Sequence, residues 1–226
     1  DVGKLFVDIG CTTREEVEKH VQIGDYCGFS GSYQELCNGR ISAKSLDNRV
    51  GCYLLIEALK RNNGKKINDV YYVFTVQEEI GCRGSVVATE QIKPDIGISV
   101  DVSPDHAYPS DLEGSNAVGE GVGIKIGDPS SIQDEYLVNQ MIDCCSENEI
   151  KYQRDVMDRG GTDSGSMNRA YHGVRVAGVS IITRYPHSQS SLVAKSDIMA
   201  AIDLIDKYTE RKFEFDSGLS FANKKT

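Results

Sequence analysis

Residues 70–76 read VYYVFTV, and QEE follows at positions 77–79. The run is almost continuously apolar and is rich in the β-branched and aromatic residues that strands favour. Such a run is typical of a central strand that is covered on both faces, as in parallel sheets. We therefore expect a buried strand here, with Glu78 and Glu79 directly beyond its carboxyl end.

Helix and strand patterns alternate on both sides of this strand. Before it, Cys52, Leu55, Ile56 and Leu59 recur at the spacing of one buried helical face. Later helices are expected at residues 83–91, around Leu137, Met141, Cys144 and Cys145, and after a Ser196 cap, with Ile198, Ala201, Ile202 and Ile205 buried. Further strands are expected at residues 96–100, 122–126 and 174–182. The pattern predicts an α/β fold, a mostly parallel mixed sheet with helices on both faces.

The first part of the chain has a different character. Residues 1–43 read as short β segments and turns, with a helix start at Thr13. We place a domain boundary near Ala43, between part of a small β-rich domain (1–43) and a larger α/β domain (44–226). The start at Asp1 without an initiator Met is expected either of a cut through a longer protein or of a tag-free product.

The composition narrows the class of protein. A formal net charge of −9 without a Lys/Arg cluster argues against nucleic acid as a partner. The seven cysteines include no C-x-x-C pair, which argues against a zinc knuckle. Their odd number and scattered positions fit a reducing, cytoplasmic setting better than a disulfide framework. No apolar run approaches the length of a membrane span, so we expect no membrane partner.

Acidic and imidazole side chains occur just beyond the expected strands, where open α/β sheets bind their ligands. They are Asp47, Glu78, Glu79, Asp101 and His187. Gathered at one edge, such groups would repel and desolvate one another unless a cation neutralised them. Their donor atoms suit zinc, cobalt or manganese. Two such ions could activate water together, with adjacent glutamates dividing the roles of metal ligand and general base.

Each of these residues also has an ordinary structural interpretation. Asp47 alone could be a helix N-cap, and Asp101 could be a turn residue. His187 could be a hydrogen-bonded structural histidine, and adjacent glutamates are usually a solvated charge pair. The metal-site hypothesis depends on the joint pattern.

Five segments carry a further signal, in this order: SLDNRVGC at 45–52, FTVQEEIGCRG at 74–84, SVDV at 99–102, GGTDSG at 160–165 and TRYPHS at 183–188. Together they resemble the tetrahedral (TET) aminopeptidase family, whose members also carry the names glutamyl aminopeptidase, leucyl aminopeptidase and endoglucanase. The resemblance implies that residues 1–43 are part of an inserted dimerisation domain and that residues 44–226 are the catalytic metallopeptidase domain. The resemblance implies removal of the N-terminal residue from peptides by a site with two divalent metal ions. It also implies a homo-oligomer, with dimers that build a dodecamer.

The resemblance further implies a role for each site residue. Asp47 would bridge the two metal ions, and Asp101 would complete one metal site. Glu79 and His187 would complete the other metal site, with Glu78 as the general base. Two more residues, Thr162 and Asp163, would contact the substrate from a glycine-rich loop.

The sequence departs from the family pattern in two places. Asn48 stands where the family usually has a second Asp, at a position that would support a ligand. The upstream His-x-Asp motif of the family, which supplies a further ligand, is not in this sequence, and His20 does not replace it. We therefore expect the chain to lack an N-terminal segment, one metal ligand and part of the sheet.

Two other functions remain open at this point. A glycoside hydrolase would need two carboxylates on opposite sides of a sugar bond, roughly 5–9.5 Å apart, and adjacent glutamates suit this badly. A non-catalytic scaffold homologue would not need to keep all five site positions.

The missing ligand leads to a first prediction. On its own, the 226-residue chain should bind at most one zinc ion tightly and should be nearly inactive. Calorimetric zinc titration and a peptidase assay check this, and two tight sites with full turnover would contradict it.

Overall fold

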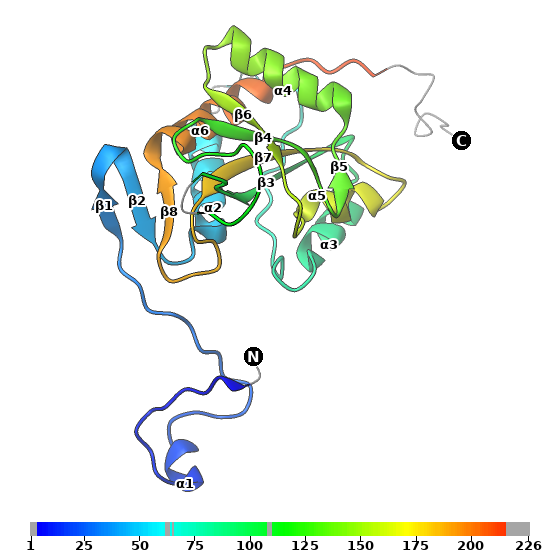
Figure 1. The fold of residues 1–226 in the computed structure, drawn as a ribbon. Coiled ribbons are helices and arrows are strands. Elements are labelled where there is room, and N and C mark those ends of the chain that lie inside the picture. The colour runs from blue at the N-terminus through cyan, green and yellow to red at the C-terminus, as the bar shows by residue number, and fades with distance from the viewer. Residues whose placement is uncertain (1–3, 62–63, 65, 108–109, 216–226) are drawn as a thin grey trace. The chain divides into compact units, whose positions relative to one another are not determined.

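The computed structural model describes residues 4–61, 64, 66–107 and 110–215, in two units, Asp1–Ser30 and Gly31–Thr226 (Figure 1). In the first unit, the Thr13 side chain caps helix α1 (Arg14–Val17), as predicted, by accepting a hydrogen bond from the Glu16 N–H. The division after Ser30 differs from the predicted boundary near Ala43. The reason is that strand β2 (Arg40–Ala43) pairs with β8 (Ser191–Ala194) in the larger unit.

A five-stranded mixed sheet forms the centre of the larger unit. Its strands are β3 (Ile96–Pro104), β4 (Val122–Asp128), β5 (Ser131–Ile132), β6 (Tyr152–Val156) and β7 (Arg175–Thr183). Their order is β3-β7-β4-β5, with β6 also paired to β4. The pairs β3–β7 and β4–β6 are parallel, whereas β4 runs antiparallel to β7 and β5. The predicted α/β fold with a mixed sheet is confirmed.

The two faces of this sheet differ in polarity, because side chains alternate along each strand. One face carries Val100 and Val102 of β3 and Val179 of β7 into the hydrophobic core. Helices α2 (Leu46–Lys60), α4 (Glu135–Glu147) and α6 (Lys195–Tyr208) pack against this core. The opposite face carries Gly97, Ser99, Asp101 and Ser103 of β3.

Helix α5 (Asp163–Arg169) packs on the polar face and contacts α3 (Arg83–Ile92). A Cβ atom at Gly97 would lie 3.0 Å from the Met167 sulfur of α5, so glycine permits this close approach. The predicted presence of helices on both faces is therefore confirmed.

A second sheet, of three antiparallel strands, adjoins the site. Its order is β1-β2-β8, and a short 3-10 helix, Cys37–Gly39 (η2), connects β1 (Gln34–Leu36) to β2. The chain passes from β2 into α2 and enters β8 from the loop after β7, so this sheet joins two segments that are distant in the sequence.

The prediction that residues 70–76 form a buried central strand is wrong. The segment has no strand pairing in the structure, and Tyr71 and Val76 are 66% and 68% exposed. β3 is an edge strand that pairs with β7, and none of the described residues pairs with its other edge. Apolar β-formers become a strand only where a neighbouring strand accepts their hydrogen bonds, and the local sequence cannot supply that neighbour.

Two predictions about helices are also wrong. In α2 the buried face is the row Leu46, Val50, Leu54 and Ala58, whereas Cys52, Ile56 and Leu59 of the predicted face are exposed. The helix is apolar on both sides, and packing against α6 decides which side is buried. Helix α6 begins at Lys195 after Ala194, so Ser196 lies in the first turn and bonds to Asp197 instead of acting as the cap. The buried face predicted for this helix is confirmed.

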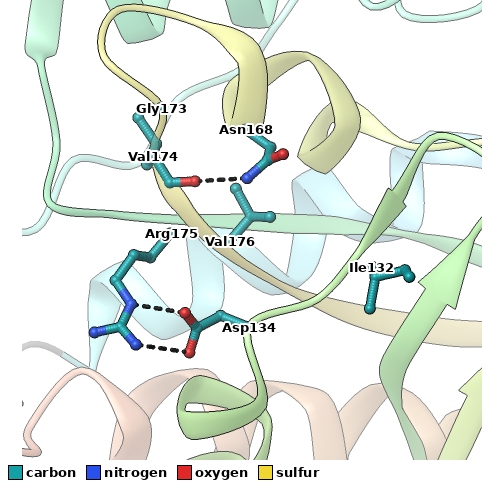
Figure 2. Close-up of a pocket in the computed structure, with 7 residues that line it drawn as sticks. All are labelled: Ile132, Asp134, Asn168, Gly173, Val174, Arg175 and Val176. Carbon is teal, nitrogen blue, oxygen red and sulfur yellow. Dashed lines mark hydrogen bonds and ion pairs between the residues drawn. The ribbon is translucent and has the colours of Figure 1, made fainter. Parts of the chain in front are cut away.

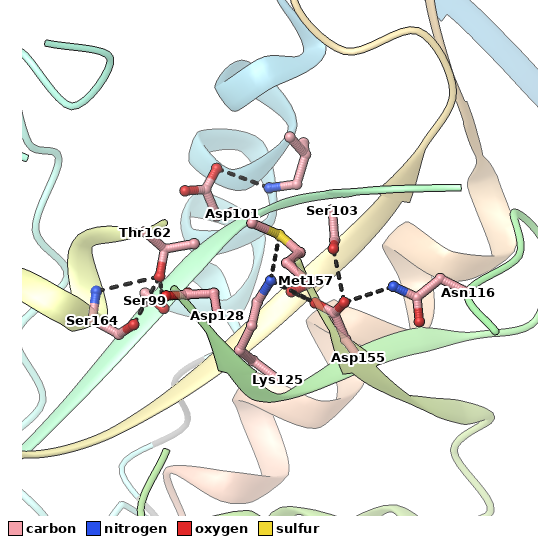
Figure 3. A network of polar contacts seen from close by, with 12 residues as sticks. Ser99, Asp101, Ser103, Asn116, Lys125, Asp128, Asp155, Met157, Thr162 and Ser164 are labelled. Carbon is pink, nitrogen blue, oxygen red and sulfur yellow. Dashed lines mark hydrogen bonds and ion pairs between the residues drawn. The ribbon is translucent and has the colours of Figure 1, made fainter. Parts of the chain in front are cut away.

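The polar face of the sheet contains a fully buried ion pair (Figure 3). Lys125 Nζ lies 2.7 Å from Asp155 Oδ2, and the two side chains are 1% and 0% exposed. Hydroxyl groups of Ser103 and Ser180 and the amide of Asn116 also donate to the Asp155 carboxylate, at 2.6–2.8 Å. Burial would raise the pKa of Asp155, but Lys125 and these donors outweigh it, and the pKa lies below its ordinary value.

Removing one partner of this pair should destabilise the fold strongly. Lys125→Met leaves a buried, uncompensated carboxylate, so the free energy of unfolding should fall by about 3–5 kcal/mol in urea titrations. Lys151→Met is the control, because it breaks a pair with Glu120 that has the similar distance of 2.8 Å but is exposed. That variant should lose less than about 1 kcal/mol, and equal losses would contradict the assignment.

Candidate functional site

Three of the five predicted site residues lie together in the larger unit. The Nε2 atom of His187 is 2.9 Å from Asp47 Oδ2 and 3.3 Å from Glu79 Oε2. One donor atom from each residue lies within 4.8 Å of the other two. Two ligand atoms at about 2.0–2.2 Å from one zinc ion can be at most about 4.4 Å apart. Both distances from the imidazole are shorter than this limit.

The pairing of β2 with β8 explains why Asp47 and His187 meet. Ala43 at the end of β2 lies opposite Ser191 at the start of β8. The chain runs from Ala43 a short way to Asp47, and His187 precedes Ser191 by a similar length. Asp47 and His187 therefore both lie close to the same end of the β2–β8 pair, although they are far apart in the sequence.

Asn48 ties the Asp47 segment to the strand of Asp101. Its Nδ2 donates to the Val100 carbonyl at 2.7 Å, and its Oδ1 accepts from the Gly51 N–H at 3.1 Å. The peptide bond between Asp47 and Asn48 is cis. Because Val100 directly precedes Asp101, the amide holds the backbones of two predicted ligands together.

Glu78 belongs to a different cluster from Glu79. The Cys82 thiol donates to Glu78 Oε1 at 3.3 Å, and donor atoms of Glu78, Cys82 and Asp163 lie within 4.8 Å of one another. Burial raises the pKa of Cys82 to about 12, so the thiol stays protonated and can donate. The adjacent glutamates thus point to separate groups. The backbone turns here, because the Glu78 carbonyl accepts hydrogen bonds from the Gly81 and Cys82 N–H groups at 2.9 and 2.8 Å.

Asp101 is the most buried of the predicted metal ligands. It is 8% exposed, and its Oδ1 accepts a hydrogen bond from the Val102 N–H at 2.8 Å. Burial raises its pKa well above the ordinary value, and the charges of Asp47 and Glu78 raise it further. Asp101 therefore shares an electrostatic environment with both clusters.

The pKa values of two other carboxyls are also raised. For Asp47, burial is the main cause and Glu79 adds to it, whereas His187 lowers the pKa. For Glu78, burial again comes first, and Asp163, Glu79 and Asp47 contribute repulsion. Crowded carboxylates of this kind are stabilised by a cation placed between them.

The structure gives the two predicted substrate contacts different surroundings. Thr162 is 2% exposed, and its hydroxyl bonds to Ser99 and Ser164 in the interior, at the start of α5. Asp163 is partly exposed and accepts hydrogen bonds from Thr75 at 2.8 Å and Ser85 at 2.6 Å.

Sequence reasoning did not identify several residues that support the site. Cys82 contacts Glu78, and Thr75 and Ser85 hold Asp163 in place. The only signal in the sequence was the position of all three beside the Glu-Glu pair, and Asp163, the target of Thr75 and Ser85, comes from a distant segment.

A shallow pocket of about 290 Å³ lies away from these clusters (Figure 2). Asp134 and Arg175 line it, joined by hydrogen bonds of 2.6 and 3.3 Å. Arg175 begins β7, whereas His187 follows the other end of this strand, which is about 27 Å long for its nine residues. The pocket is therefore not part of the candidate site.

The donor set fits a divalent metal ion. Carboxylate oxygens and one imidazole nitrogen are ligands for zinc, cobalt and manganese. His187 is 70% exposed at its side chain, so an ion from solvent can reach the Asp47, Glu79 and His187 donors. Burial and neighbouring carboxylates raise the pKa values of Asp47 and Asp101, and a divalent cation between such groups would offset their repulsion.

Comparisons with known proteins show the family to which this chain belongs. A family model described as M42 glutamyl aminopeptidase matches residues 1–204. The lysyl aminopeptidase of Pyrococcus furiosus is 33% identical, over 90% of this chain and 58% of its own length. The structure of an aminopeptidase from Desulfurococcus kamchatkensis aligns with a TM-score of 0.86 and 32% identity, over 91% of this chain and 59% of that one.

A third similar structure is that of a peptidase that can form large assemblies. The Pyrococcus horikoshii TET1 peptidase, which can assemble into a tetrahedron or a large octahedral shell, aligns with a TM-score of 0.79 and 27% identity. The alignment covers 89% of this chain and 59% of that one. The chain spans about three fifths of the length of the relatives that it matches. Within the described residues, no helix has the length and apolar character needed to cross a membrane.

The raised pKa values predict how stability depends on pH. A carboxyl whose pKa is raised on folding stabilises the fold below its unfolded pKa, near 3.8 for Asp, and this contribution is lost as the pH rises through the folded pKa. With metal removed by EDTA, Asp101→Asn should therefore lose less stability than the wild type as the pH rises above about 4. Melting temperatures across the pH range check this.

The exposed Asp95, just before the same strand, provides the control. Asp95→Asn should follow the wild-type pH curve. An Asp101→Asn curve parallel to the wild type would contradict the pKa assignment.

Proposed function

Because the chain belongs to the M42 glutamyl aminopeptidase family, we propose that the protein is a metal-dependent aminopeptidase that removes N-terminal residues from peptides. The observation that carries this proposal is the convergence of Asp47, Glu79 and His187 beside Glu78. The metal ligands and the general base that peptide hydrolysis needs then lie in adjacent clusters.

Asp47, Glu79 and His187 would hold one divalent ion, and Asp47 and Asp101 would contribute to a second. Zinc is the first choice, with cobalt or manganese as alternatives, because the donors are oxygen and nitrogen. When bound, such ions polarise a carbonyl group and lower the pKa of a water molecule. The repulsion of Asp47 and Glu78 on Asp101 supports shared cations at this position.

Glu78 would act as the general base. Its carboxylate would take a proton from the attacking water and return it to the nitrogen of the leaving amine. Burial raises the pKa of Glu78 toward the range in which a base can both accept and release a proton near neutral pH. Its contact with Cys82, away from His187, leaves it outside the Asp47, Glu79 and His187 cluster.

Asp163 would help to bind the substrate. Thr75 and Ser85 hold its carboxylate in the cluster that contains Glu78. A negative charge there would attract the free α-ammonium group, which distinguishes a peptide's N-terminus from an internal residue. The buried Thr162 would support the start of α5 and would not touch substrate.

A cytoplasmic homo-oligomer is part of this proposal. The TET1 peptidase of Pyrococcus horikoshii assembles into closed shells. In the first unit of this chain, Phe6, Ile23 and Tyr26 are 87–101% exposed, and large exposed apolar side chains are common at subunit contacts. All seven cysteines are free, as in a reducing compartment.

Exchange of the two adjacent glutamates for glutamine should separate their roles. In the intact protein, Glu78→Gln should keep its bound metal and lose about 10²–10⁴-fold in turnover of an aminoacyl anilide. Glu79→Gln should lose metal affinity first, because it removes a ligand charge. Metal analysis and kinetics of both variants check this.

Wild-type turnover by Glu78→Gln would show that another residue is the base. Activity on cellulose oligomers without activity on aminoacyl anilides would favour the glycosidase alternative. Metal-free, inactive intact protein would favour a scaffold.

A further inference from the structure

A second ion pair lies at the end of β3 and β7, close to the candidate site. The two strands run in parallel and end in register, with Pro104 opposite Thr183. The Asp105 N–H donates to the Thr183 carbonyl at 3.0 Å, which places the next residues side by side. There the Arg184 Nε donates to Asp105 Oδ2.

This pair is held firmly in the structure. The Asp105 side chain is 1% exposed and that of Arg184 is 18% exposed. Asp105 Oδ1 accepts a further hydrogen bond, from the Ala107 N–H at 2.9 Å, so both carboxylate oxygens are used. The buried Asp105 carboxylate would lose much of its stabilisation without the Arg184 guanidinium, so the pair holds the Arg184 side chain in one place.

Arg184 also stands at the start of the loop that carries His187. Its backbone N–H and carbonyl bond to Leu192 at 2.9 and 3.0 Å and close the loop 185–191. Within the loop, the Tyr185 carbonyl accepts from the Ser188 and Ser191 hydroxyls at 2.7 and 3.0 Å. The loop is thus attached to β3 through Asp105 and to β8 through Leu192.

The imidazole itself has little packing to orient it. The His187 side chain is 70% exposed, and the residue has a φ of +56°, a left-handed conformation that is uncommon for residues other than glycine. Tyr185 has a φ of +54° in the same loop. Apart from its contacts with Asp47 and Glu79, the direction of His187 therefore depends on the anchored ends of the loop.

We propose that Arg184 and Asp105 are positioning residues that fix the His187 loop to the end of β3 and so keep the imidazole beside Asp47 and Glu79. The part that concerns metal rests on the proposed function. Loosening the pair should weaken metal binding and leave proton transfer by Glu78 intact.

The test uses Arg184→Gln in the intact protein, with Arg175→Gln as the matched control. Arg175 sits at the opposite end of the same strand and donates through its Nε to Asp134 at 2.6 Å. Both variants remove one arginine–carboxylate pair from β7, but only one pair adjoins the His187 loop. Two readouts are measured: hydrogen exchange of the amides in 185–191, and titration with cobalt chloride followed by visible absorption.

Arg184→Gln should speed exchange in 185–191 by at least about tenfold and weaken cobalt binding by about 10–100-fold. At saturating metal its turnover should return to near the wild-type level, unlike Glu78→Gln. Arg175→Gln should change neither readout. Arg184→Lys, which keeps the charge, should show smaller changes than Arg184→Gln in both the exchange rate and the cobalt affinity.

Equal exchange in the two glutamine variants, or unchanged cobalt affinity in Arg184→Gln, would overturn the proposal. If Arg184→Gln does not fold, Asp105→Asn and Arg184→Lys decide it by the same two readouts. The exchange comparison does not depend on catalysis. Wild-type protein that neither binds cobalt nor cleaves peptides would reject the proposed function, and the exchange data would still decide the positioning role.

Discussion

The in-register parallel pairing of β3 with β7 is the constraint on which the site depends. The register runs unbroken from Ile96 opposite Arg175 to Pro104 opposite Thr183. The carboxyl ends of both strands therefore lie next to each other, so Asp101 and the loop that carries His187 are near the same end of the sheet. The same register directs the apolar side chains of both strands toward α2, α4 and α6.

The carboxylates near these strand ends fall into two groups, those paired with a basic side chain and those whose pKa values are raised. Asp155 is paired with Lys125 and Asp105 with Arg184, so these charges are neutralised within the chain. Asp47, Glu78 and Asp101 instead have raised pKa values, caused first by burial and then by one another. Paired carboxylates support the fold, whereas the crowded ones are the groups that, in the proposed function, would hold a cation and supply the base.

Sequence patterns succeeded where the local period and the tertiary environment agree. The α6 face of Ile198, Ala201, Ile202 and Ile205 is buried as expected, since this helix is apolar on one side. Helix α2 is apolar on both sides, so its period could not show which side meets α6. Residues 70–76 have the composition of a strand, but strand formation needs a paired neighbour that no local pattern specifies.

The sequence by itself determined the α/β class, the order of most elements and the residue types of the site, because these depend on periodicity and on donor chemistry. Only the tertiary structure decided that β2 pairs with β8 and brings His187 to within 2.9 Å of Asp47. It also decided that Glu78 turns to Cys82 while Glu79 turns to His187, and that Arg184 meets Asp105. Glu78 and Cys82 are only four residues apart, but the other contacts join segments that are distant along the chain, and their geometry follows from strand register and packing.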